Sequence, residues 1–96
     1  MMGAAAASVR RDGDALAFAG DVVAASVPAL WPQAQAGRAG AARLDLSAVT
    51  TLDSAGLALL AELAGEGALV IDGTPPRLAE LCRAYRLTPT LAYVSA

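Results

Sequence analysis

The chain has 96 residues and a formal charge of −2, with seven arginines, no lysine and no histidine. This length allows one domain. The acidic balance argues against nucleic acid as a partner, because nucleic-acid binding requires clustered cations. Without lysine or histidine, the chain has no phosphate-loop lysine, Schiff-base lysine, histidine base or histidine metal ligand.

Apolar residues make up 56% of the sequence, but many of them are alanines, which bury little area each. Leucine and valine side chains must therefore supply most of the packing energy, about 1.5–3 kcal/mol for each one that is fully buried. With such a core, a domain this short is expected to be only marginally stable when isolated and to gain stability from a bound partner.

Cys82 is the only cysteine, which excludes an internal disulfide, a CxxC pair and a cysteine-rich metal site; we expect a buried structural thiol. The N-terminus lacks the apolar run of a secretion signal, and no stretch approaches the ~18 apolar residues of a membrane span. We therefore expect a cytoplasmic protein with no direct membrane insertion. Residues 1–7 are expected to be a flexible N-terminus and residues 8–96 a single domain.

The first predicted elements are two strands over residues 8–11 and 15–19, separated by Asp12-Gly13-Asp14. Asp-Gly between candidate strands is a strong hairpin signal, because glycine accepts the positive φ of a tight turn. The pair Gly20-Asp21 is expected to end the second strand.

Apolar residues then recur at helical spacing from Val22 to Gln35. Ser26 is the predicted cap, and Pro28 falls in the first turn, where a missing N–H does no harm. Pro32 removes a hydrogen bond one turn later, which predicts a kink or a short, irregular helix. Residues 37–42 are expected to form a loop.

The next elements are a short buried strand over residues 42–47, a polar loop, and an apolar helix over residues 54–64 that Gly65-Glu66-Gly67 ends. Residues 68–72 are a continuous apolar run, typical of a strand covered on both faces. Residues 73–76 open a third helix with proline in its first turn. The expected inner stripe of that helix is Leu78, Leu81, Cys82 and Tyr85.

Pro89 is expected to end the third helix, and residues 91–94 form a short final strand or turn. A hairpin followed by alternating helices and strands predicts an α/β fold. Its sheet is small and mixed, mostly parallel, with an N-terminal hairpin at one edge and helices packed against it.

In a parallel sheet the strand-to-helix loops gather at the carboxyl ends of the strands. This brings together the polar residues of two loops into the one candidate site, namely Thr50, Thr51, Asp53 and Ser54 with Asp72, Gly73 and Thr74.

Each of these residues also has a purely structural explanation. Ser54 can be a helix cap, a role that costs ~1 kcal/mol on removal. Asp53 can be a cap or a favourable charge at the positive end of the helix. Gly56 can serve only close backbone packing, and Asp72-Gly73 only a turn. Trp31 is either a core residue or an interface residue, since tryptophan is enriched in protein interfaces.

Catalysis is disfavoured. A serine nucleophile needs a base, and a carboxylate without histidine or lysine is a poor one. Two carboxylates can do acid–base chemistry, but no sequence feature indicates the deep pocket that would raise one pKa. We expect no enzyme activity, no cofactor and no metal. A small-molecule or lipid-binding domain would need an apolar cavity, and no pattern in the sequence indicates one.

One motif covers residues 44–57 and reads Leu44-Asp45-Leu46-Ser47-x-Val49-x-x-Leu52-Asp53-Ser54-x-Gly56-Leu57. It resembles the signature of STAS domains, the sulfate-transporter and anti-sigma-factor-antagonist family. The order of hairpin, helices and strands also resembles the STAS order over nearly the whole chain. Three further stretches are residues 13–20 followed by Pro28-Ala29-Leu30-Trp31, the helix start Gly56-Leu57-Ala58-Leu59-Leu60, and Leu78-x-x-Leu81-x-x-x-Tyr85-x-Leu87. They are most similar to the MlaB type within the family, the small subunit of a phospholipid-transporting ABC transporter.

This resemblance implies a non-catalytic subunit that binds the transporter's ATPase, and through it the inner-membrane permease complex, in a system that maintains outer-membrane lipid asymmetry. Ser54 matches the serine or threonine position at the ATPase contact. The residues implied in partner binding are Thr51, Asp53, Ser54, Ala55, Gly56 and, in a secondary role, Trp31. The alternative is an anti-sigma factor antagonist regulated by phosphorylation of Ser54.

Overall fold

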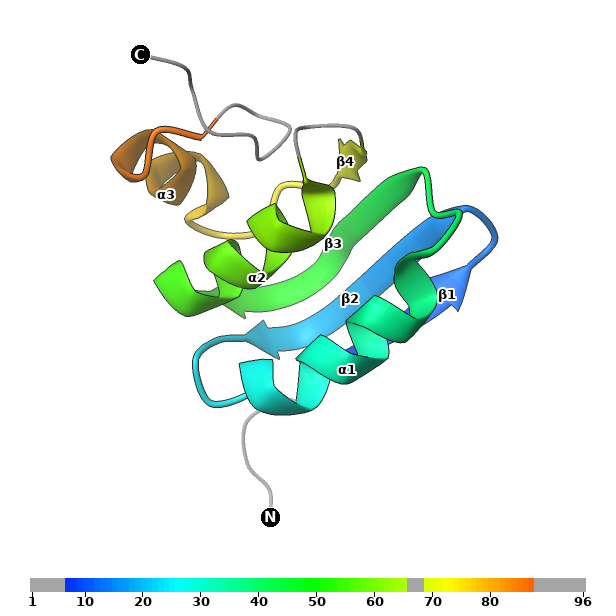
Figure 1. Cartoon of the computed structure of the whole chain (residues 1–96). Helices are drawn as coiled ribbons and strands as arrows, with labels where there is room; N and C mark the ends of the chain where they lie inside the picture. The colour runs from blue at the N-terminus through cyan, green and yellow to red at the C-terminus, as the bar shows by residue number, and fades with distance from the viewer. Residues whose placement is uncertain (1–6, 66–68, 88–96) are drawn as a thin grey trace.

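A four-stranded sheet with the order β1-β2-β3-β4 runs through the domain in the computed structural model, which describes residues 7–65 and 69–87 (Figure 1). β1 (Ser8–Asp12) is antiparallel to β2 (Ala15–Val22). β3 (Arg43–Leu52) is parallel to β2, and β4 (Val70–Asp72) is parallel to β3. The predicted fold class is confirmed.

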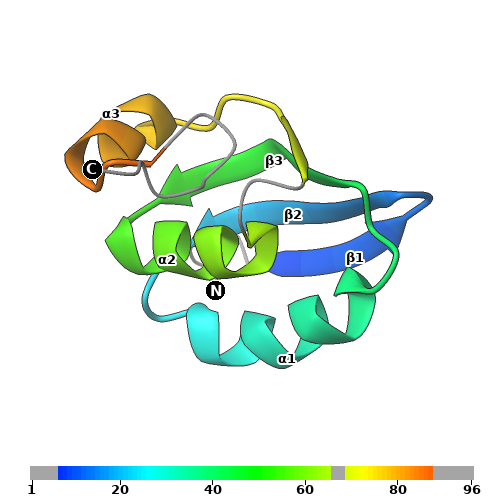
Figure 2. The same ribbon diagram turned by 45° about the horizontal axis from the view of Figure 1, so that its top comes forward.

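Two helices, α1 (Val27–Arg38) and α2 (Ser54–Ala64), lie side by side on one face of this sheet (Figure 2). The third, α3 (Leu78–Ala84), packs beside α2 at the β3–β4 side of the domain. The predictions for residues 1–6, for 66–68 and for residues 91–94 fall outside the described residues. α3 ends at Ala84, so the prediction that it continues to Pro89 was wrong.

The core lies between the sheet and the helices and consists mainly of leucines. Along β2, Leu16, Phe18 and Val22 are buried, while the alternate residues are smaller and turn to the opposite face. The largest fully buried side chains are Phe18, Leu16, Leu30, Leu44, Leu46, Leu52, Leu57, Leu60 and Val22. Leucine and valine therefore carry the packing, as the composition predicts.

The predicted hairpin is confirmed: Asp12 pairs with Ala15 across a two-residue turn in which Gly13 has φ +62°. β2 continues past its predicted end at Gly20-Asp21. The reason is its parallel pairing with β3, which includes the pairs Asp21–Thr51 and Val22–Leu52.

α1 is a continuous helix of 12 residues, so the short, irregular helix that was one of the two predictions is wrong, while the alternative of a kink at Pro32 stays a prediction. Pro32 lies inside it and cannot donate to the carbonyl of Pro28. Both prolines are exposed, so water can hydrate that carbonyl instead. The helix also extends through Arg38, into the predicted loop over residues 37–42.

Ser26 occupies the N-cap position of α1 as predicted, but its side chain does not cap the helix. The Ser26 hydroxyl instead donates to the carbonyl of Asp21 (2.7 Å) and accepts from the N–H of Val23 (3.0 Å). It therefore holds the connection between β2 and α1 in a compact turn.

β3 runs to Leu52, whereas the sequence predicted its end at Ser47 and a polar loop after it. The register between β2 and β3 shifts twice, between Ala17 and Ala19 and between Gly20 and Asp21, and pairing resumes after each shift and reaches the end of both strands. Thr50 and Thr51 are exposed, so their polarity reflects an exposed surface of the strand rather than a loop.

The prediction that both faces of β4 are covered was wrong, because the side chain of Val70 is exposed. Among the described strands β4 pairs only with β3, and Val70 is 51% exposed. α3 begins at Leu78, so the prolines precede it instead of occupying its first turn. α3 ends at Ala84, so Tyr85 lies beyond the helix and is 51% exposed. Its prediction as part of the inner stripe was wrong.

Gly56 marks the closest approach of α2 to the sheet. A Cβ atom built at Gly56 would lie 1.9 Å from the carbonyl oxygen of Val22, closer than any real contact. Glycine is therefore the residue that lets α2 pack on the end of β2, as the structural explanation of Gly56 predicts.

We predict that Gly56→Ala lowers the free energy of unfolding by about 2 kcal/mol or more, because backbone would have to move. Helix propensity alone predicts the opposite sign, a gain of about 1 kcal/mol. Urea denaturation followed by circular dichroism measures the change. The control is Ala58→Gly, at an exposed position of the same helix, with an expected loss of about 1 kcal/mol. A Gly56→Ala variant as stable as the parent chain would contradict this packing.

Candidate functional site

Asp53 joins two loops at the carboxyl ends of β2 and β3. Its Oδ1 accepts a hydrogen bond from the N–H of Gly56 (2.9 Å), and its Oδ2 accepts one from the N–H of Ala24 (3.0 Å). One carboxylate thus fixes the first turn of α2 against the loop before α1. We call the group of residues Ala24, Asp53, Ser54 and Gly56 the α2 corner.

The N-cap of α2 is Asp53 and not Ser54. Burial raises the pKa of the Asp53 carboxyl, but the backbone N–H groups of Ala24, Gly56 and Ala55 and the charge of Arg77 outweigh burial, so the net pKa lies below its ordinary value. The carboxylate therefore stays ionised at neutral pH, which favours its position at the positive end of the helix.

Ser54 is the first residue of α2 and is exposed. Within residues 7–65 and 69–87 its hydroxyl has no hydrogen-bond partner, and Asp53 performs the capping that would otherwise explain a serine here. The hydroxyl therefore belongs to an exposed residue next to an ionised carboxylate.

The other predicted contact residues differ in accessibility. Thr51 is exposed near the end of β3, Ala55 is half-buried and Gly56 is buried. Trp31 is half-buried, packs against the core and lines a shallow hollow with Leu63. Because Leu63 is nine residues beyond Ser54, Trp31 lies about 14 Å along α2 from the corner. The structure does not bring it to Ser54.

The predicted meeting of two polar loops was wrong. Asp72 pairs in register with Asp45, and its carboxylate accepts from Arg43 (2.9 Å). Thr50 lies five residues further along β3, about 16 Å away. Because β4 has three residues and β3 has ten, the carboxyl ends of the two strands are not aligned.

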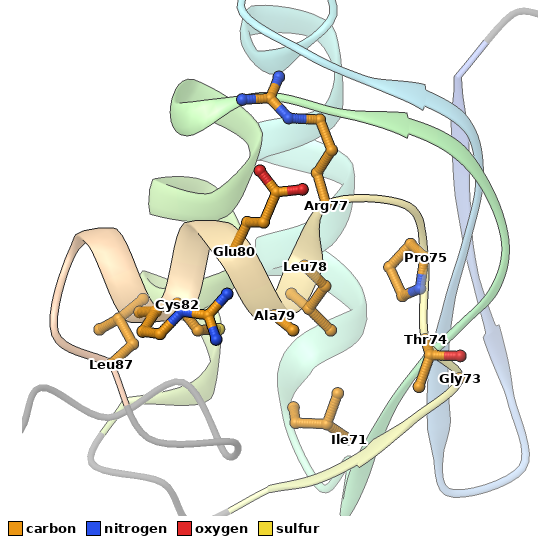
Figure 3. Close-up of a pocket in the computed structure, with 11 residues that line it drawn as sticks. Ile71, Gly73, Thr74, Pro75, Arg77, Leu78, Ala79, Glu80, Cys82 and Leu87 are labelled. Atoms are coloured by element: carbon orange, nitrogen blue, oxygen red, sulfur yellow. The ribbon is translucent and has the colours of Figure 1, made fainter.

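Two further residues act near the α2 corner and were not predicted from the sequence. Asp21, at the end of β2, accepts a hydrogen bond from the hydroxyl of Thr50 (2.9 Å). Arg77 precedes α3 with a left-handed backbone (φ 69°), and its charge acts on Asp53. Figure 3 shows Arg77 directed away from Ile71. No local pattern could show that the segment after β4 leads back toward α2.

The geometry suits binding better than proton transfer. Both oxygens of Asp53 accept hydrogen bonds from backbone N–H groups, which stabilise the ionised form and make this carboxylate a weak base for Ser54. The described part of the chain contains no group of three or more His, Cys, Asp or Glu side chains placed to hold a metal ion.

A family model described as "Mlab, STAS domain" matches residues 6–92. The chain belongs to the STAS domain family. Proteins of this family are generally non-catalytic, and STAS domains mediate protein–protein interactions. No match to a curated protein is found. Among the helices of residues 7–65 and 69–87, none combines the length and apolarity that crossing a membrane requires.

We predict that Asp53→Ala lowers the free energy of unfolding at pH 7 by about 1–2 kcal/mol, because the N-cap is lost. Asp53→Asn keeps a carbonyl oxygen that can accept a hydrogen bond from the N–H of Gly56, so its free energy of unfolding is expected to fall by less than that of Asp53→Ala. Since the folded pKa of Asp53 lies below its ordinary value of 3.8, its contribution is present above that pH and is lost as the pH falls through the folded pKa.

Urea denaturation between pH 7 and pH 3 measures this dependence. The pKa of Asp45 is also lowered, chiefly by the Ser47 hydroxyl, so the quantity to follow is the difference between parent and variant. A difference that stays constant over this pH range, or an Asp53→Ala variant of unchanged stability at pH 7, would contradict the capping role.

Proposed function

We propose that the chain is a non-catalytic STAS subunit that binds and supports the ATPase of an ABC transporter for phospholipids. In this role it contributes to outer-membrane lipid asymmetry and associates with the inner membrane through the permease complex of its partner. The MlaB-like family match supports the transporter role. The observation that carries the contact site is the exposed Ser54 hydroxyl, which has no partner among the described residues.

The α2 corner has the properties of a preorganised contact. Asp53 holds two loops together, and Gly56 places α2 directly against the backbone of β2. A surface that is already ordered loses little conformational entropy on binding, and this raises affinity. An interface of ordinary size, about 800 Å² for each partner, would extend from the corner over the adjoining helices.

Binding alone is sufficient for this function. If the subunit contacts one conformation of the ATPase better than another, it shifts the population toward that conformation. Stabilisation of the ATPase follows from the same binding energy by mass action. Neither effect requires the chain to carry out chemistry.

The second candidate is an anti-sigma factor antagonist controlled by phosphate on Ser54. The exposed hydroxyl at the start of the 11-residue helix α2 favours it. A helix N-terminus accommodates an anion, so the phosphorylated domain would remain folded. The phosphate would block the docked partner through its size and charge.

We predict that Ser54→Asp leaves the free energy of unfolding within about 0.5 kcal/mol of the parent value, since the residue is exposed and does not cap α2. The same change is expected to reduce co-purification of the ATPase at least about tenfold, which corresponds to 1.4 kcal/mol. The assay is affinity purification of the tagged chain from its native cell, with identification and quantification of the proteins that co-elute.

Ala36→Asp is the matched control, because it adds the same charge at an exposed position far along α1. It is expected to retain the ATPase. Full retention of the ATPase by Ser54→Asp would remove Ser54 from the interface. Recovery of a kinase-like anti-sigma factor instead of an ATPase, with phosphate on Ser54, would establish the second candidate.

A further inference from the structure

A cavity of about 550 Å³ lies between β4 and α3, in a chain whose sequence gave no indication of one (Figure 3). Its volume is within the range of 300–1,000 Å³ that is usual for small-molecule sites. The residues that line it are Ile71, Gly73, Thr74, Pro75, Arg77, Leu78, Ala79, Glu80, Cys82, Arg83 and Leu87.

Most of the cavity wall is apolar. Ile71 of β4 lies on one side, and Leu78 and Ala79 of α3 lie on the other, facing it across the open space (Figure 3). Leu87 and Cys82 extend this wall and are buried. Burial raises the pKa of the Cys82 thiol, so it is neutral and acts as a small apolar group.

The charge at the cavity is positive, although the whole chain is formally −2. Two arginines, Arg77 and Arg83, line it against one carboxylate, Glu80. Arg83 has no ion pair or side-chain hydrogen bond with any residue of 7–65 and 69–87. In contrast, Arg38 donates to a backbone carbonyl and Arg43 to a carboxylate.

We propose that this cavity binds a single-chain anionic amphiphile. The apolar chain would lie against Ile71, Leu78 and Leu87, and the carboxylate or phosphate head would pair with Arg83. A guanidinium matches both head groups with two parallel hydrogen bonds. The volume suits one chain better than the two chains of a phospholipid. This inference is separate from the proposed function, because it requires no ATPase.

The test titrates the isolated chain with four compounds that carry a ten-carbon chain: decanoate, decyl phosphate, decanol and decyltrimethylammonium. The charged compounds are used below their micelle concentrations, and decanol below its solubility limit. Calorimetry measures affinity, and ¹H–¹⁵N NMR locates the site. We expect both anions to bind saturably with shifts at Ile71, Leu78 and Leu87. Decanol is expected to bind at least about tenfold more weakly, which corresponds to the loss of one charge-assisted contact of 1.4 kcal/mol. The ratio of the two anion affinities distinguishes a carboxylate from a phosphate head.

Two variants and one control locate the contacts. Arg83→Ala is expected to lower the affinity for both anions at least about fivefold, because a charge-assisted hydrogen bond is lost. The affinity for decanol is expected to stay unchanged. Ala79→Trp is expected to fill the cavity and abolish all binding. The control Arg10→Ala removes the same charge from an exposed position on β1 and is expected to bind like the parent chain.

Absence of saturable anion binding, shifts confined to other surfaces, or equal affinities of Arg83→Ala and Arg10→Ala would overturn the proposal. Because Arg83 is exposed, its variant tests the proposal even if Ala79→Trp fails to fold. The outcome is independent of ATPase co-purification, so either result can fail while the other stands.

Discussion

The bridge made by the Asp53 carboxylate between two backbone N–H groups fixes the geometry of the candidate contact site. One oxygen holds the first turn of α2 through Gly56, and the other holds the loop before α1 through Ala24. Because Asp53 supplies the cap, the neighbouring Ser54 is not needed for it and stays exposed. Capping by Asp53 thus leaves the Ser54 hydroxyl available to a partner.

The order and type of the elements could be predicted from local patterns, whereas strand lengths could not. The Asp-Gly turn and the helical spacing of α2 are properties of a few adjacent residues. The end of β3 depends instead on its pairing with β2, which continues through Thr51 to Leu52. Thr50 and Thr51 are exposed and polar, so in the sequence they resemble a loop. The apolar run at β4 indicated burial, but with three residues and one neighbour in the described sheet it leaves Val70 exposed.

The candidate site shows the same division. Asp53, Ser54 and Gly56 are adjacent in the chain, so a short motif was sufficient to find them. To choose between Asp53 and Ser54 as the cap, the first residue of α2 must be known. Sequence patterns do not locate a helix end with that precision. Arg77 and the cavity arise from the path of residues 73–77 between β4 and α3, and this path is set by tertiary packing.

Arg77 contributes to both sites. It lines the cavity beside α3, and its charge helps to keep Asp53 ionised at the α2 corner. A change at Arg77 would therefore alter both places at once and could not assign an effect to either. Arg83 lines the cavity but does not belong to the α2 corner, and Ser54 lies at the corner without capping α2. These two side chains are the positions at which ligand binding and partner binding can be separated within one small domain.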